Sequence, residues 1–80
     1  MIDEHLIKLL KNISTVLEIK GENPFKARAY AKAADLIKNE DLNVHDLARN
    51  DKLGEIKGFG KALVEKITDY CENGSMQYYE

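Results

Sequence analysis

The segment that most constrains the fold is a pair of glycines that leads directly into an amphipathic helix: Ile56-Lys57-Gly58-Phe59-Gly60-Lys61. Glycine adopts positive φ angles without strain and carries no Cβ, so this pair allows a tight turn and a close approach of the backbone to a ligand. The following helix would present unpaired N–H groups and the positive end of its dipole at the same turn, which suits an anion. Because lysines flank the turn, we expect that anion to be a nucleic-acid phosphate.

Apolar spacing predicts an all-α fold, since no segment shows a strand pattern. The first helix is predicted over about residues 3–20, with Gly21 as its end. Asn23-Pro24 is a typical helix start, with Asn as the N-cap and Pro at the first helical position, and predicts a second helix over about 24–39.

Shorter elements are predicted in the second half. Asn43 and an acid three residues later indicate a short helix over 44–49. We expect Asp51 to cap one more short turn through Leu53 and Ile56. The last helix is predicted over about 61–73 and ends at Asn73-Gly74.

Length and composition indicate a single small domain over residues 1–80, with the hairpin motif at about 52–73. Eighty residues bury only about 60% of the surface of the unfolded chain, so any site must lie on the surface or in a shallow groove. The one cysteine, Cys71, excludes an internal disulfide, and with His5 and His45 it gives no metal-ligand spacing. No apolar run has membrane-spanning length, and we expect an intracellular protein of the cytoplasm or nucleoid, with no membrane partner.

The charge is unevenly distributed along the chain, although the total is only −2. Residues 24–38 carry a net +3 and residues 56–67 a net +2, which leaves −7 for the rest. Attraction to phosphate depends on the local field within a Debye length of ~8–10 Å. The sequence is therefore compatible with a modest basic face, and it argues against tight coating of DNA.

Apolar residues around the glycine pair extend the motif on both sides. Leu53 and Ile56 precede Gly58-Phe59-Gly60, and Val64 and Ile67 follow at helical spacing. This pattern resembles a helix-hairpin-helix motif, in which two short helices present a glycine turn to a DNA phosphate.

A second segment makes the resemblance more specific. Residues 20–34 read KGENPFKARAYAKAA, and this run is similar to the amino-terminal domain of X-family DNA polymerases, above all of the bacterial and archaeal branch. The carboxyl end, residues 73–80, resembles the point where that domain meets the polymerase fingers. The resemblance covers nearly the whole chain and is strongest over 20–37 and 53–79.

The resemblance implies roles for particular residues. Lys66 lies where some family members have the Schiff-base nucleophile of a 5′-deoxyribose-phosphate lyase. Phe25 lies where a base-stacking side chain is found, and Lys26, Tyr30 and Lys32 lie at phosphate-side positions. Gly54 and Ala62 replace two lysines of the 5′-phosphate pocket. Asp69, on the same helix as Lys66, favours the ammonium form, whereas such a nucleophile must react as a neutral amine.

The leading hypothesis is a sequence-nonspecific DNA-binding module, acting in DNA repair, that grips backbone phosphate near gaps, nicks or 5′-phosphorylated ends. Further polymerase domains in cis or a protein partner in trans would complete its role. The expected DNA-binding residues are Phe25, Lys26, Arg28, Tyr30, Lys32, Lys57, Gly58, Phe59, Gly60 and Lys61.

Two alternatives remain open. One is a lyase with Lys66 as the catalytic residue. The other is a protein-interaction module, which is compatible with the acidic remainder of the surface. We expect no cofactor and no metal site, except that the resemblance implies a monovalent cation at the hairpin turn.

Overall fold

The computed structural model describes residues 3–74, which fold into four α-helices and one short 3-10 turn. In chain order these are α1 (Glu4–Lys20), α2 (Pro24–Asn39), α3 (Val44–Arg49), η1 (Leu53–Glu55) and α4 (Lys61–Asn73). No strand occurs in this part of the chain, so the predicted all-α class is confirmed. The predicted bounds of the last three helices agree with the structure, and the first begins one residue later than predicted.

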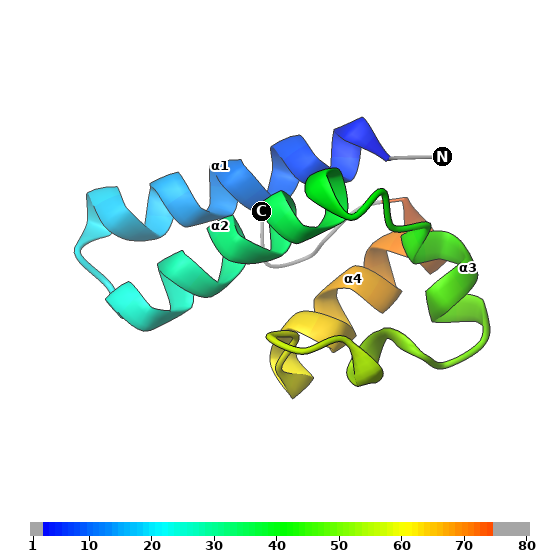
Figure 1. Ribbon diagram of the computed structural model, residues 1–80. Helices are drawn as coiled ribbons and strands as arrows, with labels where there is room; N and C mark the ends of the chain where they lie inside the picture. The colour runs from blue at the N-terminus through cyan, green and yellow to red at the C-terminus, as the bar shows by residue number, and fades with distance from the viewer. Residues whose placement is uncertain (1–2, 75–80) are drawn as a thin grey trace.

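Helices α1 and α2 form a long antiparallel hairpin, and the shorter elements pack at one end of it (Figure 1). The chain reverses at Gly21, which has a φ of 69°. The amides of Gly21 and Glu22 bind the carbonyls of Glu18 and Leu17 at 3.1 Å each, which is the hydrogen-bond pattern of a Schellman motif. The buried hydroxyl of Ser14 then ties the two helices together by donating to the Ala27 carbonyl at 2.6 Å.

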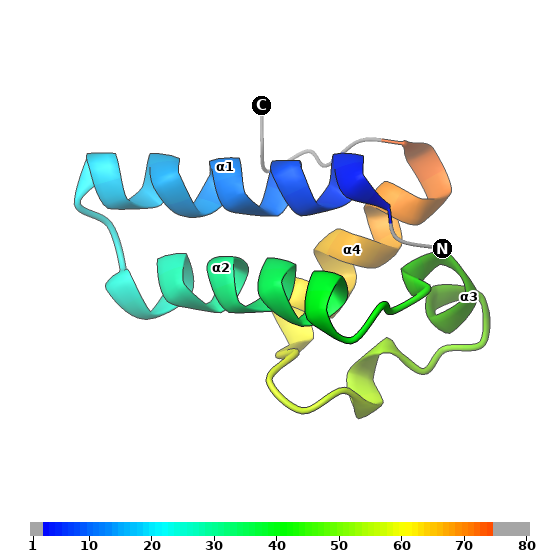
Figure 2. The ribbon, with the colours of Figure 1, turned by 45° about the horizontal axis from the view of Figure 1, so that its top comes forward.

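Helix α4 crosses beneath this hairpin, so its last turns lie beside the first turn of α1 and beside α3 (Figure 2). A single core results, because every helix contributes side chains to it. Its largest fully buried members are Leu6, Leu10, Ile13, Ile37, Val44, Leu53 and Ile67. Tyr70 is buried and Cys71 half-buried at the rim, as the sequence predicted.

The role predicted for Asp51 is wrong. The residue before η1 is Lys52, and η1 has no side-chain cap. Asp51 instead has a φ of 58° and ends α3, where the amides of Asp51 and Lys52 bind the carbonyls of Ala48 and Leu47. Aspartate tolerates the left-handed region better than most residues, so it can end a helix in the place of glycine.

Candidate nucleic-acid interface

The glycine turn joins η1 to α4 and is closed by one backbone hydrogen bond. The Phe59 amide donates to the Ile56 carbonyl at 3.1 Å. Gly58 occupies the third position of this four-residue turn with a φ of 98°, the position at which a type II turn requires a positive φ. A Cβ built on Gly58 would lie 3.7 Å from Leu36 Cδ1, so the turn lies against the second half of α2.

Gly60 has a different function from Gly58, because its backbone does not require glycine. Its φ of −73° and ψ of 170° are extended values that any residue adopts, and a Cβ there would meet nothing within 4 Å. Gly60 is also the N-cap of α4. Glycine at this position therefore leaves the start of the helix uncovered rather than relieving strain.

The start of α4 is the most open helix start among the α-helices between residues 3 and 74. The side chains of Asp3, Asn23 and Asn43 cap α1, α2 and α3, whereas α4 has no side-chain cap. Its first intrahelical bond runs from the Val64 amide to the Gly60 carbonyl at 2.9 Å. The helical amides before Val64 have no acceptor within α4, and they lie at the positive end of the helix dipole.

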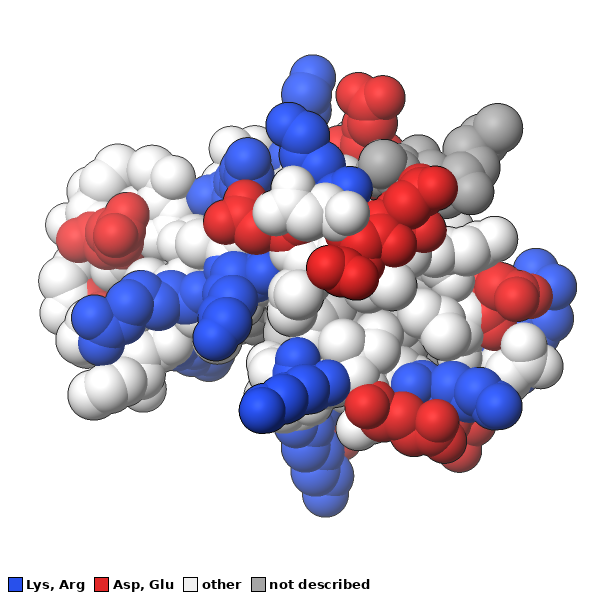
Figure 3. Space-filling model, in the orientation of Figure 1, with Lys and Arg blue, Asp and Glu red and all other residues white. Residues whose placement is uncertain are grey.

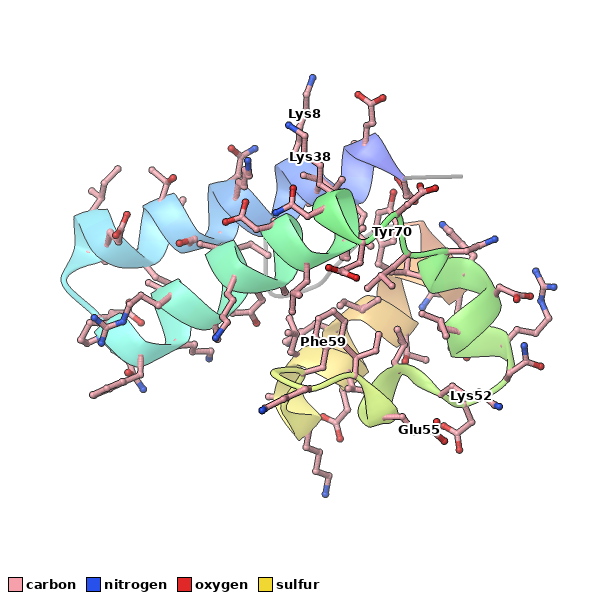
Figure 4. All side chains as sticks on the ribbon, in the orientation of Figure 1. Lys8, Lys38, Lys52, Glu55, Phe59 and Tyr70 are labelled. Carbon is pink, nitrogen blue, oxygen red and sulfur yellow. The ribbon has the colours of Figure 1, made fainter. Side chains whose placement is uncertain are left out.

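Lysines surround this open helix start. Lys57 and Lys61 are exposed, and basic side chains, which are all lysines in this segment, project from the glycine turn and the first turn of α4 (Figure 3). Lys52 and Glu55 lie further along the same edge (Figure 4). The glycine turn therefore combines unpaired helix amides, two lysines close in sequence and an unobstructed backbone, which makes it the candidate anion site.

Lys66 lies on α4 beyond this first turn and is half-buried. It also takes part in an interaction within the chain. The two positions at which the sequence lacks the family's lysines, Gly54 and Ala62, are both exposed. Lyase chemistry at Lys66 stays a prediction from the resemblance.

A second group of predicted residues lies on α2. Phe25, at the start of the helix, is 74% exposed, and the Arg28 guanidinium carbon lies 5.0 Å from the centre of its ring. Lys32 is exposed and Lys26 is half-buried. The start of α2 lies at the far end of the α1–α2 hairpin from α3 (Figure 1), so Phe25 and Arg28 lie on a part of the surface that is separate from the glycine turn.

Two predicted contact residues belong to the core instead. Tyr30 is 2% exposed and Phe59 is 7% exposed, so neither aromatic side chain forms part of the outer surface. Both were predicted among the DNA-binding residues, and with their side chains buried only their backbones could contact DNA. Phe59 anchors the turn from inside, and Tyr30 anchors α2 against the other helices, so both position the interface without belonging to its surface.

A polar cluster that the sequence pattern did not reveal lies where α1, α3 and α4 meet. Asp3 Oδ2 accepts from His45 Nε2 at 2.7 Å, and Asp3 Oδ1 accepts from the Leu6 amide at 3.0 Å and from the Tyr70 hydroxyl at 3.3 Å. The same hydroxyl lies 2.9 Å from His5 Nδ1. Since a phenol has one proton and gives it to Asp3, His5 donates to Tyr70.

This cluster shifts three pKa values. Burial acts to raise the pKa of Asp3, but hydrogen bonds from His45, Leu6 and Tyr70 hold it below its ordinary value. Burial and the Asp3 charge raise the pKa of Tyr70 to about 12. Burial, with the charges of Asp3 and Glu72, also raises the pKa of the Cys71 thiol, which favours its protonated form.

The structure offers few other ligand sites. Within residues 3–74, no group of three or more His, Cys, Asp or Glu side chains could hold a metal ion. No helix in that range is long and apolar enough to cross a bilayer. The hairpin turn could offer a monovalent cation only backbone oxygens, because no acid lies between Ile56 and Lys61, and the Ile56 carbonyl already accepts one hydrogen bond.

A glycine turn held between a short helical turn and an uncapped helix defines a helix-hairpin-helix domain. Comparison with known families agrees, because a family described as "Helix-hairpin-helix domain" matches residues 1–76. The chain belongs to this family, in the form found in X-family DNA polymerases.

A relative supports that assignment. The chain is 32% identical over 75 residues to "DNA polymerase/3'-5' exonuclease PolX" of Bacillus subtilis (strain 168). The match covers 94% of this chain and 13% of that protein, so the chain spans a small part of its relative. No solved structure gives a significant match. The predicted junction with polymerase fingers falls largely in residues 75–80, outside the described residues.

Proposed function

We propose that this domain binds DNA through its backbone, without reading sequence, near gaps, nicks or 5′-phosphorylated ends. The observation that carries the proposal is the uncapped start of α4 beside the glycine turn. In α1, α2 and α3 a side chain covers the helix start, and at Gly60 nothing does. A phosphate oxygen would accept from the amides that a side-chain cap would otherwise bind.

The glycines let the phosphate reach those amides. Gly60 has no neighbour within 4 Å of a built Cβ, so the path to the backbone is open. Lys57 and Lys61 add charge on either side of the turn. Because phosphates carry no sequence information, such a site positions the domain on any DNA. Few phosphate contacts imply weak binding with a modest salt dependence, because the log-log slope changes by only about −0.9 for each phosphate neutralised.

The start of α2 supports a preference for interrupted DNA. The exposed Phe25 ring has the Arg28 guanidinium over one face, which leaves the opposite face for a base. An unpaired or terminal base can stack there, whereas a base inside an intact duplex cannot. Lys26 and Lys32 on the same helix would contact the flanking phosphates, and Lys66 would add a backbone contact from α4.

In this proposal the domain holds a DNA repair intermediate for polymerase domains in cis or for a partner in trans. The support is the relative, whose name describes a DNA polymerase and exonuclease. A monovalent cation at the turn would neutralise charge where the phosphate approaches, and this part of the proposal rests on the family resemblance alone.

The test uses fluorescence anisotropy at low salt with a gapped duplex that carries a 5′-phosphate. The double variant Lys57→Glu/Lys61→Glu is expected to lose about tenfold or more in affinity and to show a shallower salt slope. Lys8→Glu/Lys38→Glu is the matched control, since it changes the total charge equally but lies on the opposite side of the molecule. Equal affinity of the hairpin variant and the parent protein overturns the proposal.

A second variant tests the preference for gaps. Phe25→Ala is expected to weaken binding to the gapped duplex about threefold or more, in line with the loss of one base–aromatic stack, and to leave binding to an intact duplex unchanged. An equal loss on both DNAs would show that Phe25 does not recognise the interruption.

A further inference from the structure

A second cationic surface lies away from the glycine turn, between the first turns of α1 and the end of α2. It is a groove with a cavity of about 320 Å³, lined by Glu4, Ile7, Lys8, Lys11 and Lys38. Lys8 and Lys38 lie close together and point away from the glycine turn, which is marked by Phe59 (Figure 4). We call these five residues the lysine groove.

The lysine groove combines an apolar floor with a charged rim. Ile7 belongs to the core and is 7% exposed. Lys8 and Lys38 are exposed, and lysine stems cover apolar surface while their ammonium groups remain in water. Lys11 lies 3.9 Å from Asp35, with both side chains at least half exposed, so this ion pair is weak and Lys11 can exchange partners.

We propose that the lysine groove binds an acidic peptide segment of a protein partner, with one large apolar side chain of that segment seated over Ile7. The cavity has the volume to take one leucine-sized or larger side chain. Carboxylates on both sides of that side chain would meet Lys8, Lys11 and Lys38. This charge complementarity, around an apolar floor, is what selects an acidic peptide as the occupant.

Nucleic acid fits the same groove less well. Glu4 lines it directly and Asp35 lies beside Lys11, and acidic side chains alternate with basic ones along this edge (Figure 3). A phosphate backbone carries only negative charge and would be repelled by both acids. A peptide can place a neutral or basic residue against Glu4 and thereby avoid that repulsion.

The position of the groove allows two ligands at once. The glycine turn and the lysine groove lie on opposite sides of the α1–α2 pair (Figure 4). A peptide in the groove would therefore not block DNA at the start of α4. The domain would then connect a DNA end to an acidic segment of a second protein or of another domain.

The test is an amide-resolved NMR titration of the ¹⁵N-labelled chain with the peptide acetyl-Ser-Asp-Asp-Leu-Asp-Ser-amide, which has acidic residues on both sides of its Leu and neutral residues at its ends. We expect saturable shifts at the amides of Ile7, Lys8, Lys11 and Lys38. Lys8→Glu/Lys38→Glu should weaken binding about tenfold, and Lys57→Glu/Lys61→Glu should leave it within about twofold. A peptide with Ala in place of Leu should bind at least about threefold more weakly.

Several outcomes would overturn this assignment. One is the absence of saturable shifts, and another is an equal loss in both double variants. Stronger saturable binding of a single-stranded oligothymidylate at the same amides would assign the groove to nucleic acid. Lys57→Glu/Lys61→Glu is the test variant for DNA and the control for the peptide, and Lys8→Glu/Lys38→Glu is the reverse. Failure of one proposal therefore leaves the other measurable.

Discussion

Asp3 and His45 are 42 residues apart in sequence, yet their side chains form a 2.7 Å hydrogen bond that joins the start of α1 to α3. The same carboxylate caps α1 through the Leu6 amide and accepts from Tyr70 of α4. One side chain therefore connects three helices. Because α4 carries the open helix start at the hairpin, this connection helps to hold the proposed DNA-binding helix in its place on the α1–α2 pair.

Replacing Asp3 with Ala should destabilise the domain by about 2 kcal/mol. The variant loses a helix cap, typically ~1 kcal/mol, and leaves the partly buried Tyr70 hydroxyl without its acceptor. Urea unfolding followed by circular dichroism measures the change. Asp35→Ala is the control, since Asp35 is exposed and contributes only a weak ion pair. Equal destabilisation of the two variants would show that the Asp3 cluster has no special role.

The lowered pKa of Asp3 predicts a loss of stability in acid. Because its folded pKa lies below the unfolded value, Asp3 contributes stability that is present above about pH 4 and is lost as pH falls through the folded pKa. Unfolding free energies measured from pH 6 downwards should decrease through this range. In Asp3→Asn the unfolding free energy should decrease less steeply with falling pH, by no more than one proton in the slope, and an unchanged slope would contradict the assignment.

Local and long-range features differ in how well the sequence revealed them. The bounds of α2 and α3 followed from Asn23 and Asn43, because a cap and the amides it binds lie within three residues of each other. The Asp3 cluster could not be found in the same way. Its members come from three separate helices, and only tertiary packing brings them together.

The candidate site shows the same division. The glycine turn and the charges around it were predictable, since Gly58 and Gly60 act through local backbone geometry. The burial of Tyr30 and Phe59 was not, because an aromatic residue beside lysines is equally compatible with a stacking surface and with a core position. The lysine groove was missed because Lys8 and Lys38 lie on different helices.

The raised pKa of Tyr70 predicts the opposite behaviour in alkali. A phenol held neutral in the folded state contributes stability that is present below pH 10 and is lost as pH rises from 10 to about 12. Tyrosinate absorbance should therefore show a late-titrating step to which Tyr70 contributes and which accompanies unfolding. Tyr70→Phe should reduce the amplitude of this late step by one tyrosine, and an unchanged amplitude would assign the step to other tyrosines.

Borohydride trapping on a 5′-deoxyribose-phosphate substrate tests chemistry at Lys66. We expect no adduct that depends on Lys66, because Gly54 and Ala62 supply none of the charge that the resemblance places around such a nucleophile. Lys66→Ala should still weaken DNA binding a few-fold through the loss of one phosphate contact. An adduct that forms with the parent chain and disappears in Lys66→Ala would instead establish lyase activity.

Gly60→Ser separates the stability of α4 from its proposed function. Serine is a preferred N-cap, and its hydroxyl can accept from the amides at the start of α4, so the variant should be more stable by a few tenths to about 1 kcal/mol. The extended backbone at Gly60 accepts the new side chain without strain. That hydroxyl would occupy the amides proposed for phosphate, and affinity for the gapped duplex should therefore fall about tenfold. Gly21→Ser is a useful contrast. Serine at a φ of 69° should destabilise the domain, whereas the glycine turn at Gly58 and Gly60 is left unchanged. If Gly60→Ser gained stability and kept full DNA affinity, the phosphate would have to bind elsewhere.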